Sequence, residues 1–189
     1  RLIAIVEKLA PHDVVIVSDY AKGCVTKDVV KALKAKFGPS TIVADNKPKN
    51  APLMRGIYAI TPNMKEAAEL TGINATTDAL AVRAVNQLGK RFLTSVILTR
   101  GEYGVTLREK KDGTIRHFRS TVLSVKDVTG AGDTLVAALA LMCAAGTPLA
   151  EAVELANFAA GIAVAQRGTV ALSRKELLEH VKTLSVYPR

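Results

Sequence analysis

Residues 127–146 read DVTGAGDTLVAALALMCAAG, and the character of this stretch changes after its seventh residue. The first seven residues hold two carboxylates, Asp127 and Asp133, with glycines at 130 and 132 between them. The remainder is almost wholly apolar and predicts a helix over about 130–145, which we expect to be buried in the core because it is apolar on all faces. An unpaired carboxylate is costly to bury, so two of them beside such a helix indicate a chemical purpose.

Short apolar runs and helical patterns alternate upstream of this stretch. A strong hairpin signal, Asp112-Gly113, then joins two further strand-like runs. Strands that alternate with helices predict an α/β fold, with a mostly parallel sheet and helices on both faces. The expected strands are 14–18, 41–45, 57–61 and 95–100, and the expected helices are 26–38, 63–72, 77–90, 130–145, 148–167 and 173–185.

Polar residues and a glycine follow the expected strands. Ligands of open α/β sheets bind beyond the carboxyl ends of the strands. The convergence of several such residues at one edge of the sheet predicts a ligand site there. The residues at this edge are Asp19, Asp45, Asn63 and Gly101.

The composition restricts the classes of partner. The chain has 189 residues, of which 49% are hydrophobic and 23% charged, an ordinary globular composition. Its formal net charge of +9 attracts anions, but the basic residues are scattered and aromatic residues make up only 4%, with no Trp. A surface that stacks bases needs aromatic side chains among the charges, so a phosphate-rich substrate is favoured over nucleic acid.

The cysteines and the apolar runs give no sign of an extracellular or membrane protein. Cys24 and Cys143 are too few for a disulfide framework or a zinc site, and we expect both to be small buried hydrophobic residues. The longest apolar run, 135–146, has 12 residues and is too short to cross a bilayer. No signal peptide is visible, so we expect a cytoplasmic location and no membrane partner.

Glycines before a helix suggest an anion site. Gly130 and Gly132 leave backbone N–H groups unpaired at the positive end of the helix dipole. Asp133, in the first helical turn, can accept a proton from a hydroxyl while those N–H groups hold a transferring phosphoryl group. The alternative is that Asp133 only complements the dipole and that the glycines only make a tight turn.

The whole stretch resembles the signature D-x-T-G-A-G-D of the ribokinase-like (PfkB) carbohydrate kinases. The resemblance implies a three-layer αβα sandwich, ATP and Mg²⁺ as cofactors, and Asp133 as the catalytic base. It implies an anion hole at Gly130, Ala131 and Gly132. Asp127 and Thr129 would shape the loop and adjoin a monovalent-cation site.

Asn63-Met64-Lys65-Glu66 is similar to the N-x-x-E motif of this family, which is associated with magnesium and the ATP phosphates. Mg²⁺ commonly keeps several waters, so Glu66 can act as its ligand partly through water. The alternative is a capping box, in which Asn63 caps a helix and Glu66 bonds back to it.

Two further positions resemble nucleotide-binding elements of the family. Thr99, Gly101 and Gly104 are similar to the T-x-G-x-x-G turn that lies along the nucleotide, although an ordinary turn before a hairpin has the same pattern. Asn157 matches a helix that borders the adenine in relatives. The small residues that follow it also suit simple helix packing.

Within the family, SDYAKG (18–23), ADNK (44–47) and TPNMKEAAE (61–69) look most like bacterial heptose-7-phosphate kinases, which serve lipopolysaccharide synthesis. Close relatives often have Asp-Pro-Lys where this chain has Asn46 before Lys47, so the backbone that Pro would fix is free here. Lys47 and Lys22 are candidates for binding a phosphate or an anionic substrate. The alternative for both is a solvated lysine beside the end of a sheet.

The chain begins at Arg1 and its first residues have the pattern of mid-domain sequence. We expect residues 1–189 to be the C-terminal, nucleotide-binding part of a PfkB kinase domain. The Gly-Gly sugar motif, much of the sugar pocket and the lid of relatives would lie in a preceding segment. No H-x-G-H motif of a fused nucleotidyltransferase is present.

These features predict ATP-dependent phosphoryl transfer to a sugar hydroxyl, with heptose 7-phosphate converted to heptose 1,7-bisphosphate. One alternative is another PfkB kinase, acting on ribose, a fructose phosphate or a keto-deoxy sugar acid. Another is a nucleotide-binding fragment without turnover, and a basic nucleic-acid module is a distant third. The expected partner is a sugar or sugar phosphate, and a homodimer is considered for the full-length protein.

Overall fold

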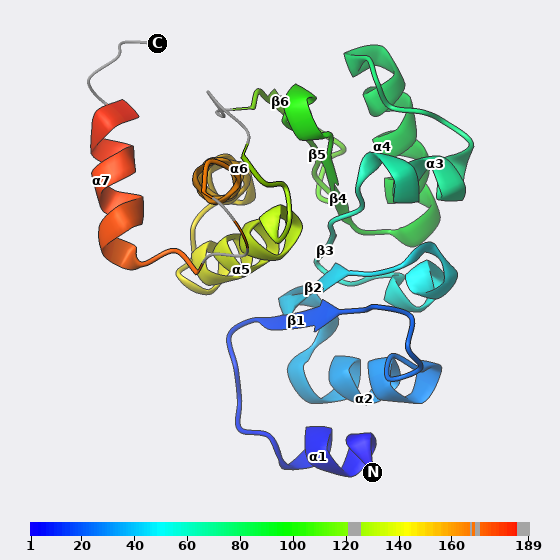
Figure 1. Cartoon of the computed structure of the whole chain (residues 1–189). Helices are drawn as coiled ribbons and strands as arrows, with labels where there is room; N and C mark the ends of the chain where they lie inside the picture. The colour runs from blue at the N-terminus through cyan, green and yellow to red at the C-terminus, as the bar shows by residue number, and fades with distance from the viewer. Residues whose placement is uncertain (121–125, 167, 169–170, 185–189) are drawn as a thin grey trace.

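The computed structural model describes residues 1–120, 126–166, 168 and 171–184 (Figure 1). Within them, six strands form one sheet in the order β1-β2-β3-β4-β5-β6. The first four strands are parallel, and β5 and β6 are antiparallel to their neighbours, so the predicted mostly parallel sheet is confirmed. The strands are β1 (Val15–Ser18), β2 (Ile42–Asp45), β3 (Ala59–Ile60), β4 (Ser95–Thr99), β5 (Val105–Arg108) and β6 (Ile115–Phe118).

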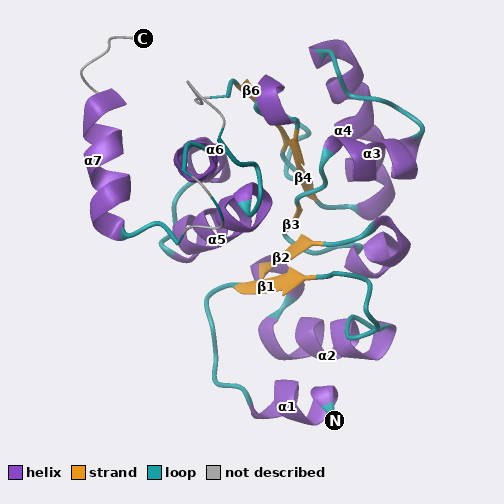
Figure 2. Ribbon diagram, viewed as in Figure 1, coloured by secondary structure: helices purple, strands orange, loops and turns teal. Residues whose placement is uncertain are grey.

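Helices cover both faces of the sheet, as Figure 2 shows. On one face lie α2 (Lys27–Phe37), α3 (Met64–Thr71) and α4 (Asp78–Phe92), with α1 (Leu2–Lys8) packed against α2. On the other face lie α5 (Ala131–Ala144) and α6 (Leu149–Val164), with α7 (Arg174–Leu184) outside α6. Short 3-10 segments span Pro39–Thr41, Pro48–Met54 and Gly101–Tyr103.

The sheet separates two hydrophobic clusters. Successive residues of a strand point to opposite faces. In β4, Val96 and Leu98 therefore pack in the cluster that contains Leu88 of α4, whereas Ile97 packs in the cluster that contains Leu139 of α5. Burial of such side chains holds the three layers together, at about 1.5–3 kcal/mol for each fully buried aliphatic residue.

The expectation that α5 is buried on all faces is wrong. Leu135 and Leu139 are buried against the sheet and α6, but Ala137 is exposed and Leu141 is 65% exposed. The reason is geometric, because α5 contacts β1, β2 and α6 with one side and residues 137, 141 and 144 lie on the other. The neighbouring helix α6 is the more completely buried of the pair.

Most predicted element boundaries agree with the structure to within two residues, because polar caps and glycines mark them. The Thr26 and Thr77 hydroxyls accept backbone hydrogen bonds at the starts of α2 and α4, and Gly72 ends α3 in the left-handed region. The predicted strand 57–61 is shorter, and α6 ends at Val164 rather than 167. Residues 167 and 185, the predicted ends of the last two helices, lie outside the described residues.

The two cysteines differ from expectation. Cys24 is exposed, so its predicted burial is wrong, because it lies in the loop between β1 and α2. Cys143 is half-buried beside Tyr58, and burial is the main factor that raises the pKa of its thiol. No helix in the described part of the chain has both the length and the apolar character that a membrane crossing requires.

Candidate active site

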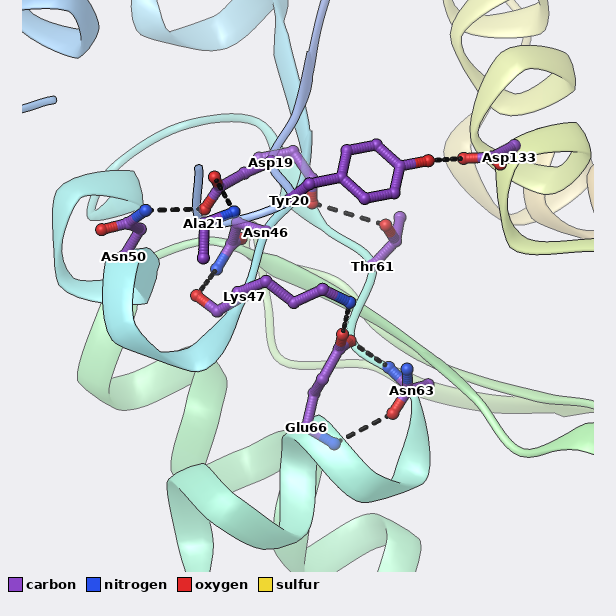
Figure 3. Close-up of polar contacts among 11 residues, drawn as sticks. Asp19, Tyr20, Ala21, Asn46, Lys47, Asn50, Thr61, Asn63, Glu66 and Asp133 are labelled. Carbon is purple, nitrogen blue, oxygen red and sulfur yellow. Dashed lines mark hydrogen bonds and ion pairs between the residues drawn. The ribbon is translucent and has the colours of Figure 1, made fainter. Parts of the chain in front are cut away.

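The carboxyl ends of the parallel strands bring together residues that are far apart in the sequence (Figure 3). Asp19 follows β1, Asp45 ends β2, Asn63 follows β3 and Gly101 follows β4. A backbone bridge between Asn63 and Thr99 continues the pairing of β3 and β4 into this region. The residues predicted to gather at the carboxyl edge of the sheet therefore do lie there.

A cavity of about 520 Å³ lies on the side of this edge that faces α5 and α6. It is large enough for a nucleotide, since small-molecule sites commonly have volumes of about 300–1,000 Å³. Its walls combine residues of all the nucleotide motifs found in the sequence. Among the residues that line it are Asn63, Met64, Lys65, Thr99, Gly101, Gly104, Ala131, Gly132 and Asn157.

A second, smaller cavity of about 160 Å³ lies beside the first turn of α5. Asp133 lines it together with Asp45 and Ser18, while the backbone just before Asp133 lines the larger cavity. Gly130 is the N-cap of α5 and has a φ of +82°, a left-handed conformation that favours glycine. The helix N-terminus thus stands between the two cavities.

Asp127 closes the loop that precedes α5. One of its carboxylate oxygens accepts a hydrogen bond from the Thr129 N–H at 2.9 Å, and the other accepts one from the Gly168 N–H at 3.2 Å. The bond from Thr129 is the main reason that the pKa of Asp127 lies below its usual value. Its carboxylate therefore shapes the loop, as predicted from the sequence. A role of Asp127 and Thr129 beside a monovalent cation stays a prediction.

Each carboxylate oxygen of Glu66 accepts one hydrogen bond from a protein donor. Its Oε2 accepts from the Asn63 N–H at 3.0 Å and the Asn63 side chain accepts from the Glu66 N–H at 2.9 Å, so the capping-box alternative is present in the structure. Its Oε1 lies 2.7 Å from Lys47 Nζ (Figure 3). The hydrogen bond to Glu66 is the main factor that raises the pKa of Lys47. Lys47 is therefore paired with Glu66, while 44% of its side chain remains exposed.

Asp45, which the sequence analysis placed at this edge of the sheet, lines the smaller cavity together with Asp133. Burial, followed by the nearby charge of Glu66, raises the pKa of Asp45 to about 6, while Lys47 acts in the opposite direction. Carboxylates with displaced pKa values gather at functional sites. The available sequence signal was its position at the end of a buried strand, in line with Asp19.

The turn after β4 is anchored from behind by Arg100, whose side chain is buried. Its guanidinium donates to the Asp78 carboxylate at 2.7 Å, to the Ala75 carbonyl at 3.0 Å and to the Thr106 hydroxyl at 3.2 Å. Gly104 ends the turn at a φ of +79°, and a Cβ there would lie 2.0 Å from the Phe118 carbonyl oxygen. The shape of this turn therefore requires glycine at position 104.

The remaining predicted residues divide into two groups. Asn157 is buried, lines the larger cavity and donates to the Arg119 carbonyl at 2.8 Å, so it also holds the segment after β6. Lys22 is exposed and lines neither of the two cavities.

Among the described residues, no group of three or more His, Cys, Asp and Glu side chains is arranged to hold a metal ion.

A mostly parallel sheet between two layers of helices, with a cavity at its strand ends, is typical of α/β proteins that bind a small ligand there, and sequence comparison identifies the family. Residues 38–176 match the pfkB family carbohydrate kinases. The match covers more than half of the chain, and the chain belongs to this family. The family predicted from the D-x-T-G-A-G-D stretch is confirmed.

Among curated proteins, the chain is similar to the bifunctional protein HldE of Azorhizobium caulinodans, with 42% identity over 171 residues, 89% of this chain and 36% of that protein. It is likewise 42% identical to the bifunctional protein HldE of Caulobacter vibrioides, over 93% of this chain and 37% of that protein. The chain thus spans little more than a third of the length of these relatives.

Solved structures give the same fold. Phosphofructokinase-2 from Escherichia coli, in complex with substrates and products, matches with a TM-score of 0.80 and 19% identity over 97% of this chain and 61% of its own. Arabidopsis thaliana ribokinase, complexed with ribose and ATP, matches with a TM-score of 0.77 and 24% identity over 95% of this chain and 58% of its own. The ribokinase-like sandwich predicted from the sequence is therefore confirmed.

Proposed function

We propose that this chain binds ATP in the larger cavity and supplies the base for phosphoryl transfer to a sugar hydroxyl. The observation that carries the proposal is the position of the α5 N-terminus, with Gly132 on the nucleotide-sized cavity and Asp133 on the smaller one. A base at that point can reach an acceptor hydroxyl while adjacent N–H groups face the transferring group.

In this reaction, the Asp133 carboxylate takes the proton of the acceptor hydroxyl while the oxygen of that hydroxyl forms a bond to the γ-phosphorus. The bond from that phosphorus to the leaving oxygen of ADP breaks in the same step, and the N–H groups of residues 130–132 stabilise the charge on the transferring group. Asn63, Thr99 and the rigid Gly101–Gly104 turn hold the nucleotide, and Asn157 borders its base.

Glu66 fits a magnesium ion that is held mainly by phosphate and water, because such a site needs only one or two carboxylates. The bound ion would neutralise phosphate charge. Lys47 now pairs with Glu66, and its ammonium group could turn from that carboxylate to a phosphate without leaving the site. A monovalent cation beside Asp127 and Thr129 would stiffen the loop further.

We further propose heptose 7-phosphate as the acceptor. The support is the resemblance of residues 18–23, 44–47 and 61–69 to bacterial heptose-7-phosphate kinases. The neighbouring structures extend beyond the matched part, since this chain covers only 58–61% of them. We therefore propose that residues 1–189 form the nucleotide-binding part of a larger kinase domain, and that the rest of the domain completes the sugar site.

A product assay of the full-length protein with ATP and a panel of sugars tests this function. Heptose 7-phosphate should give the highest kcat/KM, with a heptose 1,7-bisphosphate product. A higher kcat/KM for ribose, a fructose phosphate or a keto-deoxy sugar acid would show that the proposed acceptor is wrong and that the proposed kinase activity is right. Nucleotide binding without transfer to any sugar would instead favour a regulatory fragment.

A further inference from the structure

Tyr20 contacts the proposed catalytic base. It lies in the loop after β1, and its side chain crosses toward the first turn of α5 (Figure 3). Its hydroxyl donates a hydrogen bond to Oδ1 of Asp133, with 3.4 Å between the two oxygens. The residue as a whole is 63% exposed. Burial therefore does not explain the placement of this large aromatic side chain.

The loop that carries Tyr20 is held on both sides. Asp19 is buried, and its carboxylate accepts from the Ala21 N–H at 2.8 Å and from the Asn50 side chain at 2.8 Å. The Asp19 N–H donates to the Asp45 carbonyl at 2.8 Å. Ala21 has a φ of +56°, a conformation that residues other than glycine seldom adopt and that persists where the surroundings fix it.

The chemistry of the contact suits a base. An ionised carboxylate only accepts hydrogen bonds, and its two oxygens can serve different donors. A phenol on Oδ1 fixes the rotation of the Asp133 side chain and leaves Oδ2 for the acceptor hydroxyl. A separation of 3.4 Å is long for two oxygens. Hydrogen bonds at catalytic groups commonly shorten when the substrate is bound.

Resting on the function proposed above, we propose that Tyr20 is a positioning residue for phosphoryl transfer. Its hydroxyl holds Oδ1 of Asp133 so that Oδ2 faces the acceptor, on the side of the smaller cavity that Asp45 and Ser18 also line. The hydrogen bonds that the Asp19 carboxylate accepts from Ala21 and Asn50 fix the loop and thereby the position of the phenol.

The test replaces Tyr20 in the full-length protein. Tyr20→Phe keeps the ring and removes the hydroxyl, so kcat should fall about 10-fold to 100-fold, the size expected for one hydrogen bond to a charged group. The KM for ATP should stay within about twofold, because Tyr20 does not line the nucleotide cavity. Tyr58→Phe is the matched control and should leave kcat unchanged. Tyr58 lies just before β3 in the sequence, and its side chain lies beside Cys143.

A double-variant cycle in rate separates this role from a structural one, and a second cycle in unfolding tests whether the two groups interact. If the hydroxyl acts through Asp133, Tyr20→Phe should cause no further loss of rate in the Asp133→Asn background. The same two changes should be non-additive in the free energy of unfolding of the full-length protein, which needs no turnover. Wild-type kcat in Tyr20→Phe, or additivity in the unfolding cycle, would overturn the proposal.

The outcomes also distinguish this proposal from the proposed function. If the wild-type protein transfers phosphate and Asp133→Asn does not, normal turnover in Tyr20→Phe removes only the role of Tyr20. If the wild-type protein transfers no phosphate to any sugar, the proposed function fails. The unfolding cycle then still decides whether the Tyr20 hydroxyl and Asp133 are coupled.

Discussion

Gly132 and Asp133 are consecutive residues, yet they line different cavities. One peptide unit therefore separates the proposed nucleotide side of the site from the proposed acceptor side. This arrangement follows from Gly130, the N-cap of α5, whose left-handed conformation turns the chain into the helix. It makes the carboxylate at 133 the first group to test.

Asp133→Asn should reduce phosphoryl transfer to a small residual rate and leave the affinity for ATP nearly unchanged. Asn keeps the shape of the side chain but cannot take a proton, a loss on the order of 10²–10⁴ in rate. Steady-state kinetics and ATP titration of the full-length protein measure both effects. Asp28→Asn, in the exposed first turn of α2, is the control. Near wild-type turnover in Asp133→Asn would remove the base assignment.

Glu66→Gln should raise the concentration of Mg²⁺ needed for half-maximal rate and lower the maximal rate. Gln can still accept the bond from the Asn63 N–H, so the helix cap should survive, but it loses the charge that attracts the ion. The measurement is the rate as a function of Mg²⁺ concentration at saturating ATP.

Lys47→Met gives the companion result for that ion pair. If Lys47 turns to a phosphate during the reaction, its loss should raise the KM for ATP or for the sugar phosphate, while the Mg²⁺ requirement stays level. If Glu66→Gln also has a wild-type Mg²⁺ dependence, Glu66 serves only the capping box and the ion pair with Lys47.

Arg100→Ala should reduce the free energy of unfolding by about 1–3 kcal/mol, because buried acceptors lose their donor, whereas the carboxylate partner Asp78 is exposed and can be solvated. Ala75 and Thr106 would lose donors, and the Gly101–Tyr103 turn would lose its support. The KM for ATP should rise as well. Urea unfolding and kinetics check both effects, with Arg116→Ala on the exposed side of β6 as the control. Unchanged values in both assays would contradict the anchoring role.

Asp45→Asn should stabilise the protein at neutral pH by about 1–2 kcal/mol, a value reduced for partial exposure. Burial raises the pKa of Asp45 from 3.8 to about 6 in the folded protein. Because the folded state then binds the proton more tightly, its stability from this group falls as pH rises from about 4 to 6. The unfolding free energies of wild type and variant should therefore converge near pH 4, separate between pH 4 and 6, and differ by a constant amount above pH 6. A difference that is already constant between about pH 4 and 6 would contradict the assignment.

The sequence was a good guide wherever the signal is local. Thr26, Asn63 and Thr77 cap helices at the predicted places, because a cap and its partner lie within three residues of each other. α1 was not predicted, and its first residue has no side-chain cap. The burial of α5 was overestimated because an apolar composition does not say which side of a helix meets a neighbour.

The site was predictable in part for the same reason. Most motif residues that line the larger cavity follow strands or start helices, so topology gathers them, whereas Asn157 lies in the middle of α6. Two contacts could not be found this way, because their partners are distant in the sequence. Lys47 pairs with Glu66 across 19 positions, and Tyr20 reaches Asp133 across 113.

The bonds around Asp127 have a mechanical consequence. The N–H groups of Lys126 and Asp127 donate to the Val164 carbonyl at the end of α6, and the Asp127 carboxylate accepts from Gly168 just beyond it. These bonds fasten the start of α5 to the end of α6, so the two helices should move as one rigid body. Asp133 and Asn157 then keep a fixed separation during any domain motion. A hinge for closure over substrates would therefore have to lie outside this helix pair.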